Sequence, residues 1–302
     1  MKHYWAYAVV PNDGNNGMEF RIKLRDKCRF ILNECYFTMC KGSRSEGIGV
    51  IYESDYFQID LVTQENEKNA ENIMKRAVNL LVYITGVPYE IYCLKKDVNW
   101  DLAPININMS KKKILKLQEI DFQYKRISRK KELLENVLQL YSLAAKYSVL
   151  LEDGEESFFA MFRIVEKIVK DEFGIEYRNI DNGYNDMRDY VKEIITNCYN
   201  IKMPLNKIDS FAGNLASELF DKVFSDIYSK IAWFCGKKNI NYDENVLARA
   251  VKLRNQLAHG ENVCINPLSD EIRLINTLSH MCIQEKFFNN IKHCYLDVDI
   301  LT

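Results

Sequence analysis

Two patterns of hydrophobic and polar positions divide this chain. In the first hundred residues, short stretches of aromatic and β-branched side chains alternate with turn-forming residues, as at 11–17 and 41–45. This pattern predicts strands, of which the clearest are residues 4–10, 18–24, 48–53 and 56–62. Ser54-Asp55 is short enough to form a hairpin turn between the last two.

The hydrophobic period then changes to that of a helix. Apolar residues recur at helical spacing over residues 69–85, and Gly86 supplies a stop signal, with another strand expected at 89–94. Beyond residue 109 the pattern is helical throughout. It predicts helices at residues 130–150, 155–172, 187–200, 205–235, 243–259 and 269–293. Gly213 weakens the stretch 205–235, which leaves two helices there as an alternative.

An Asn-rich stretch with Pro104, between residues 97 and 109, marks the expected domain boundary. The predicted fold class is therefore α+β. A β-rich N-terminal domain with at least one helix covers residues 1–108, and an all-α helical bundle covers residues 109–302.

Composition narrows the class of protein. The 302 residues are 47% hydrophobic and carry a formal net charge of −1, so any nucleic-acid contact must come from a local patch. The nine cysteines include no C-x-x-C pair, which argues against a zinc knuckle and a disulfide scaffold and favours reduced thiols. No signal peptide and no membrane-length apolar run is visible, so we expect a cytoplasmic protein without membrane contact.

One local concentration of basic residues opens the helical half. Residues 109–132 hold nine Lys or Arg residues against three acidic ones. An exposed helical linker is the simpler interpretation, because charge runs usually face water. The alternative is contact with an RNA backbone, through Lys111, Lys112, Lys113, Lys125, Arg126, Arg129 and Lys130.

The most specific chemical signal is an arginine and a histidine near the C-terminal end, in Leu253-Arg254-Asn255-Gln256-Leu257-Ala258-His259-Gly260. Histidine can exchange protons near neutral pH and arginine suits phosphate oxygens, so the pair fits phosphodiester chemistry without a metal. Five helical residues rotate the chain by about 500°, which would point the two side chains apart. We expect Gly260 to end the helix and let the ring of His259 turn toward Arg254.

This segment resembles the R-x4–6-H signature of the HEPN superfamily, in which a polar residue follows the arginine. Residues 156–168 are similar to the core helix of those domains, and the resemblance covers residues 130–295. The layout resembles ApeA-like abortive-infection proteins, where a β-rich part precedes the HEPN bundle. The resemblance implies an endoribonuclease that cuts single-stranded RNA, with tRNA as one candidate, in antiphage defence.

The resemblance also implies a mechanism and an assembly. The ribose 2′-hydroxyl would attack the adjacent phosphate and leave a 2′,3′-cyclic phosphate, with His259 as general acid or base, Arg254 stabilising charge and Asn255 orienting groups. One motif per chain predicts a homodimer with a composite cleft. The N-terminal domain would sense an unidentified trigger. The alternative is a non-catalytic module for dimerisation or for nucleotide or RNA binding.

Other polar residues carry weaker signals. Glu166 is a candidate support for Arg254, although an ordinary ion pair explains it equally well, and Arg163 could pair with Glu166 on the same helical face. His280 and His293 are expected to be structural, and His3 has no evident partner. No metal-ligand set or cofactor motif is found, so no metal and no cofactor are predicted.

Overall fold

The computed structural model describes residues 1–9, 29–40, 56–97, 111–150, 153–177, 181–198, 203–261, 263, 266 and 269–288. The chain divides into two compact units. Unit 1 comprises residues 1–164, 265–267 and 276–302, and unit 2 comprises residues 165–264 and 268–275. The predicted boundary near residue 108 falls outside the described residues, so the domains 1–108 and 109–302 stay a prediction.

Unit 1 is built on a five-stranded sheet in which all neighbouring strands are antiparallel, in the order β2-β3-β4-β1-β5. The strands are β1 (Lys2–Val9), β2 (Arg29–Leu32), β3 (Cys35–Cys40), β4 (Tyr56–Thr63) and β5 (Glu90–Asp97). The predictions at 4–10, 56–62 and 89–94 are confirmed by β1, β4 and β5. Those at 18–24 and 48–53, and the turn at Ser54-Asp55, lie outside the described residues. A sheet followed by helices confirms the α+β class.

The hairpin of β2 and β3 was not predicted. Its turn residues Asn33 and Glu34 both have positive φ, 45° and 67°, a conformation that glutamate rarely adopts. The Asn33 backbone N–H donates to Asp121 Oδ1 at 2.7 Å and its side-chain amide to the Ile73 carbonyl at 3.3 Å. Contacts from distant helices therefore stabilise a turn that local sequence does not mark.

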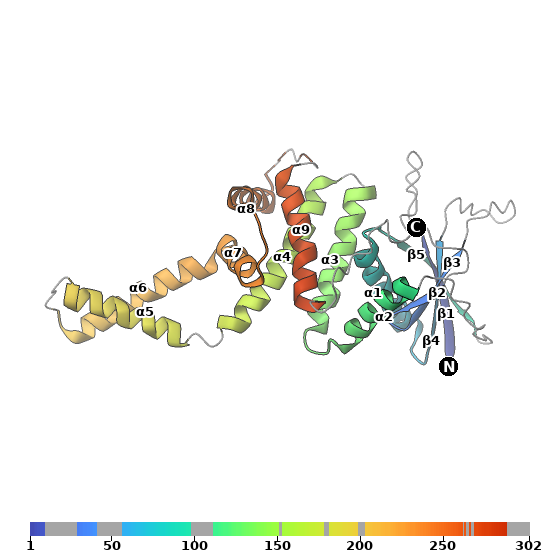
Figure 1. Cartoon of the computed structure of the whole chain (residues 1–302), viewed down its shortest axis with the longest axis horizontal. Coiled ribbons are helices and arrows are strands. Elements are labelled where there is room, and N and C mark those ends of the chain that lie inside the picture. Colours follow the sequence, from blue (N-terminus) through green and yellow to red (C-terminus); the bar gives the residue numbers. More distant parts are fainter. Residues whose placement is uncertain are drawn as a thin grey trace. The chain divides into compact units, whose positions relative to one another are not determined.

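The core of unit 1 lies between one face of the sheet and α1 (Glu67–Thr85) (Figure 1). Alternate strand residues such as Phe37, Phe57 and Ile59 are fully buried. Asn66 caps the start of α1, and Gly86, at φ 67°, ends it as predicted. α2 (Lys111–Arg126) contacts β2, and α3 (Lys131–Leu150) packs along α1.

His3, for which the sequence shows no partner, is paired in the structure. Its Nε2 lies 3.0 Å from Asp60 Oδ1, and both side chains are buried. Gln58 also donates to Asp60, so the carboxylate has two partners on this face of the sheet. The pairing joins residues 57 positions apart, on β1 and β4, which explains why the sequence does not reveal it.

Unit 2 is helical in its described residues. It contains the second part of α4 (Gly154–Tyr177), then α5 (Asp181–Glu193) with a π-helical turn (Ile194–Cys198), α6 (Leu205–Ser225), α7 (Ile227–Lys238), α8 (Glu244–Ala258) and the start of α9 (Asp270–Phe287). α5 and α6 run side by side (Figure 1). The apolar side chains that pack between them and the π-helical turn are Val191, Ile195, Ile208, Ala212 and Leu215.

The predicted stretch 205–235 is two helices, but they divide at Asp226 and not at Gly213. The Asp226 carboxylate accepts a hydrogen bond from the Ser229 N–H at 3.0 Å and so caps α7. Gly213 lies inside α6. Along the described part of the chain, no helix has the length and apolarity needed to span a membrane.

Candidate functional site

The end of α8 carries the three residues of the motif. Asp243 caps the start of this helix, and Leu247, Ala250 and Val251 form its buried face. Arg254 stands seven residues after Leu247, two helical turns along the same face. The hydrophobic pattern of α8 therefore directs Arg254 toward the interior of unit 2.

The helix ends where the sequence predicts. Gly260 has φ +73°, its N–H donates to the Leu257 carbonyl at 3.0 Å, and the Glu261 N–H donates to the Gln256 carbonyl at 3.0 Å. This pair of bonds is a Schellman motif, which requires a left-handed residue at the glycine position. His259 is the capping residue, with φ −91° and ψ 3°.

Arg254 is held by a carboxylate from another helix. Its Nη2 donates to both oxygens of Glu166 on α4, at 3.1 and 3.0 Å, and its Nη1 donates to Asn255 Oδ1 at 3.1 Å. The side chain of Arg254 is 26% exposed and that of Glu166 is 13% exposed. The guanidinium is thus oriented but still reachable from solvent.

Glu166 is a carboxylate in a basic setting. Burial alone would raise its pKa, but hydrogen bonds from Lys170 and Arg254, and their positive charges, lower the pKa below the ordinary value. Lys170 Nζ lies 2.5 Å from Glu166 Oε1. Lys230 is also close enough for Glu166 and Lys170 to affect its pKa, which burial and Lys170 lower. The carboxylate therefore stays ionised among cations.

His259 does not meet Arg254 as the sequence led us to expect. The backbone of His259 is close to helical, so its side chain and that of Arg254 point in the different directions that five helical residues impose. The side chain of His259 is exposed. Within the described ranges, the ring makes no hydrogen bond or ion pair with Arg254 or any other residue. A single chain thus brings Arg254 and Asn255 together but leaves His259 apart from them.

The two predicted supporting residues have different settings. Glu166 contacts Arg254, as the support hypothesis requires, although the contact alone does not distinguish support from an ordinary ion pair. Arg163 is exposed, and among the described residues Glu166 pairs with Lys170 and Arg254 and not with Arg163. The structure therefore shows no ion pair between Arg163 and Glu166 among the described side chains, and a supporting role of Arg163 stays a prediction.

The basic segment lies in unit 1, whereas Arg254 lies in unit 2. The side chains of Lys111, Lys112 and Lys113, on α2, are outside the described residues. Lys125 pairs with Asp121 at 2.7 Å, and Lys130 has a positive φ of 70° before α3. Arg126 lies over the ring of Phe122 at 5.1 Å, and both Arg126 and Arg129 are exposed.

Lys131, at the end of the basic run, has a structural role. Its Nζ donates to the Tyr124 carbonyl at 2.7 Å, and burial lowers its pKa to about 8. Of this run, Arg126 and Arg129 are the described side chains best placed to meet an external anion.

Sequence reasoning missed the two lysines near Glu166. Lys170 follows Glu166 by four residues, a helical spacing that could have indicated the pair. Lys230, on α7, is 64 residues away from Glu166 in the chain, and no local pattern indicates that they are neighbours. His293 lies outside the described residues.

No group of three or more His, Cys, Asp or Glu side chains could hold a metal ion in the part of the chain that the structure covers. Comparisons of this chain with protein-family models, with curated proteins and with solved structures find no match.

Proposed function

We propose that the protein is a metal-independent endoribonuclease of the HEPN type, working in the cytoplasm as a homodimer in antiphage defence. The observation that carries the proposal is the arrangement around Arg254. An arginine, a polar neighbour and a histidine stand at one helix end, and Glu166 fixes the orientation of the guanidinium. The residue pattern is the one on which the resemblance to HEPN domains rests.

Each residue has a part in the reaction. One His259 accepts the proton of the ribose 2′-hydroxyl, whose oxygen then attacks the adjacent phosphorus. Arg254 stabilises the negative charge that builds on the phosphorane oxygens. The 5′-oxygen leaves and takes a proton from a second acid, so the products are a 2′,3′-cyclic phosphate and a 5′-hydroxyl end.

The need for a second acid supports the dimer. One chain supplies one His259, and that ring makes no described contact with its own Arg254. A two-fold axis beside the end of α8 would bring two motifs to one cleft and supply both a proton acceptor and a proton donor. The exposure of Asn255 and His259 leaves this end of the helix open to a second copy.

His259→Ala tests the enzymatic proposal. Because general acid–base catalysis contributes about 100- to 10,000-fold, the variant should lose about that factor in the cleavage rate of single-stranded RNA. The assay uses end-labelled RNA, including tRNA, with EDTA present throughout, and the wild-type enzyme should stay active. Equal cleavage by wild type and variant would show that His259 is not catalytic.

A mixing experiment tests the composite cleft. In the proposed cleft each chain supplies one His259, so a dimer of one wild-type chain and one His259→Ala chain lacks either the proton acceptor or the proton donor. This mixed dimer, purified through two different tags, should cleave RNA almost as slowly as the His259→Ala homodimer, whereas two independent sites would leave about half of the wild-type rate. Mass measurement by light scattering should give a dimer for wild type and for His259→Ala, and a monomeric wild type would overturn the proposal.

The second candidate is a non-catalytic module that dimerises or binds a nucleotide or RNA. It is favoured by the fact that Arg254 already bonds Glu166 and Asn255, as a structural arginine would. This alternative predicts a dimer that leaves RNA intact under all conditions. In that case Arg254→Ala should weaken the dimer or the fold without any effect on RNA.

A further inference from the structure

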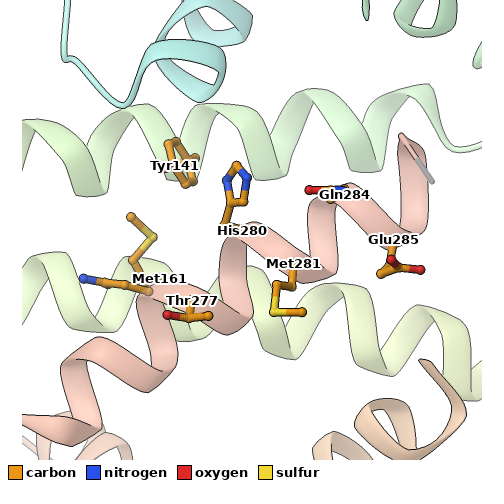
Figure 2. Close-up of a pocket in the computed structure, with 8 residues that line it drawn as sticks. Tyr141, Met161, Thr277, His280, Met281, Gln284 and Glu285 are labelled. Carbon is orange, nitrogen blue, oxygen red and sulfur yellow. The ribbon is translucent and has the colours of Figure 1, made fainter. Parts of the chain in front are cut away.

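A pocket lies in unit 1, and none of its described lining residues belongs to the proposed active site. It has a volume of about 570 Å³, within the range of roughly 300–1,000 Å³ that is typical of small-molecule sites. Residues of α3, α4 and the second part of α9 line it (Figure 2). All of them belong to the same compact unit.

One wall of the pocket is aromatic. Figure 2 shows Tyr141 of α3 and His280 of α9 close to each other, and their ring centres are 6.3 Å apart. His280 is stacked on Tyr83 at 4.9 Å, which fixes the plane of the imidazole. Two thioethers, Met161 and Met281, complete the apolar surface. Rigid rings beside polarisable sulfurs suit a flat aromatic ligand.

The polar side chains of the pocket can form hydrogen bonds with the edge of such a ligand. Asn276 and Gln284 each carry a carboxamide, which offers a donor and an acceptor side by side, as the edge of a nucleobase does. Burial lowers the pKa of His280 to about 4, so its ring is neutral at neutral pH. The wall next to the ligand is therefore uncharged.

Charge limits what can enter. Among the lining residues that the structure describes, none is a lysine or an arginine, and the one carboxylate is that of Glu285. A phosphate group would meet a carboxylate without a compensating cation, which opposes binding of nucleotides. The cation-rich surroundings of Glu166 in unit 2 have the opposite character.

We propose that this pocket binds an uncharged nucleobase or nucleoside and discriminates against its phosphorylated forms. The proposal concerns unit 1 alone and does not depend on RNA cleavage by Arg254 and His259.

Calorimetric titration of the full chain tests the proposal, with adenosine, guanosine, cytidine and uridine and their 5′-monophosphates as probes. At least one nucleoside should bind, and its monophosphate should bind about tenfold more weakly because of Glu285. Glu285→Gln should reduce the difference between the affinities of the nucleoside and of its monophosphate. Gln284→Leu keeps the side-chain size but removes the carboxamide, and should weaken nucleoside binding by about tenfold.

The matched control is Gln139→Leu, the same substitution at an exposed position of α3 outside the pocket, which should bind as the wild type does. Circular dichroism of each variant checks that it is folded. The proposal is overturned if no nucleoside binds, if monophosphates bind as tightly as nucleosides, or if Gln284→Leu binds as well as Gln139→Leu.

Discussion

His259 and His280 place the same side chain in opposite physical settings. His259 ends α8 in unit 2 and is exposed to solvent, five residues along the chain from Arg254, whose orientation is set by a carboxylate. His280 lies in unit 1, stacked on Tyr83, where burial keeps it neutral. A histidine suited to proton transfer needs access to its substrate and a pKa near neutrality, whereas a half-buried ring that stays neutral serves packing or recognition. The setting, and not the residue type, separates these functions.

The largest effect expected from this contrast is the pH dependence that His280 gives to the free energy of unfolding. A folded-state pKa of about 4 lies below the unfolded value, so the unfolded chain binds the proton more readily as pH falls from about 6.5 toward 4. The stability associated with the neutral ring is present above that window and is lost within it. His280→Phe keeps an aromatic ring but cannot titrate.

Wild type should therefore lose about 3 kcal/mol more stability than His280→Phe between pH 7 and pH 4. Urea unfolding followed by circular dichroism at each pH measures the difference. Parallel pH profiles for the two proteins would mean that the pKa of His280 is not lowered in the folded protein.

Glu166→Ala tests how far catalysis at the end of α8 depends on the ion pair between Arg254 and Glu166. Without the carboxylate, the guanidinium of Arg254 loses its orientation, and misplacement of a catalytic group costs about 100-fold in rate. Cleavage of labelled RNA measures the loss. Glu166→Gln, which keeps one acceptor oxygen, should recover part of the rate.

Lys170→Ala is the control, since it removes the other partner of Glu166 and leaves the bond to Arg254. It should cost less than Glu166→Ala. If Glu166→Ala cleaves RNA at the wild-type rate while His259→Ala does not, Glu166 forms an ordinary ion pair and has no positioning role.

Gly260→Ala affects the same helix end through the backbone alone. A Cβ at this position would meet no atom within 4 Å, so the cost comes only from the φ of +73°. A non-glycine residue in the left-handed region costs about 1–2 kcal/mol, and thermal unfolding should show this loss. Gly236→Ala, in α7, is a matched control with equal space and should be neutral or stabilising. A neutral Gly260→Ala would show that the helix does not need this stop.

These contrasts show which parts of the molecule the sequence can predict. Periodicity predicted α1, β1 and the stop at Gly260, because each depends on residues that are neighbours in the chain. The turn at Asn33-Glu34, the pair of His3 and Asp60, and the proximity of Lys230 to Glu166 depend on residues far apart in sequence. Local pattern holds no information on them. The motif itself was visible, but the separation of His259 from Arg254 needed coordinates.

The smallest expected effect concerns the basic segment of unit 1. Arg126 and Arg129 are exposed, whereas the Lys131 ammonium donates to the Tyr124 carbonyl, so among the described side chains of this segment we expect the two arginines to contact an RNA backbone. Replacing both with alanine should lower RNA affinity severalfold and reduce the slope of log affinity against log salt by about 1 for each lost phosphate contact. Filter binding over a series of salt concentrations measures this slope, with catalytically inactive His259→Ala as the background. An unchanged slope would mean that neither Arg126 nor Arg129 contacts an RNA backbone.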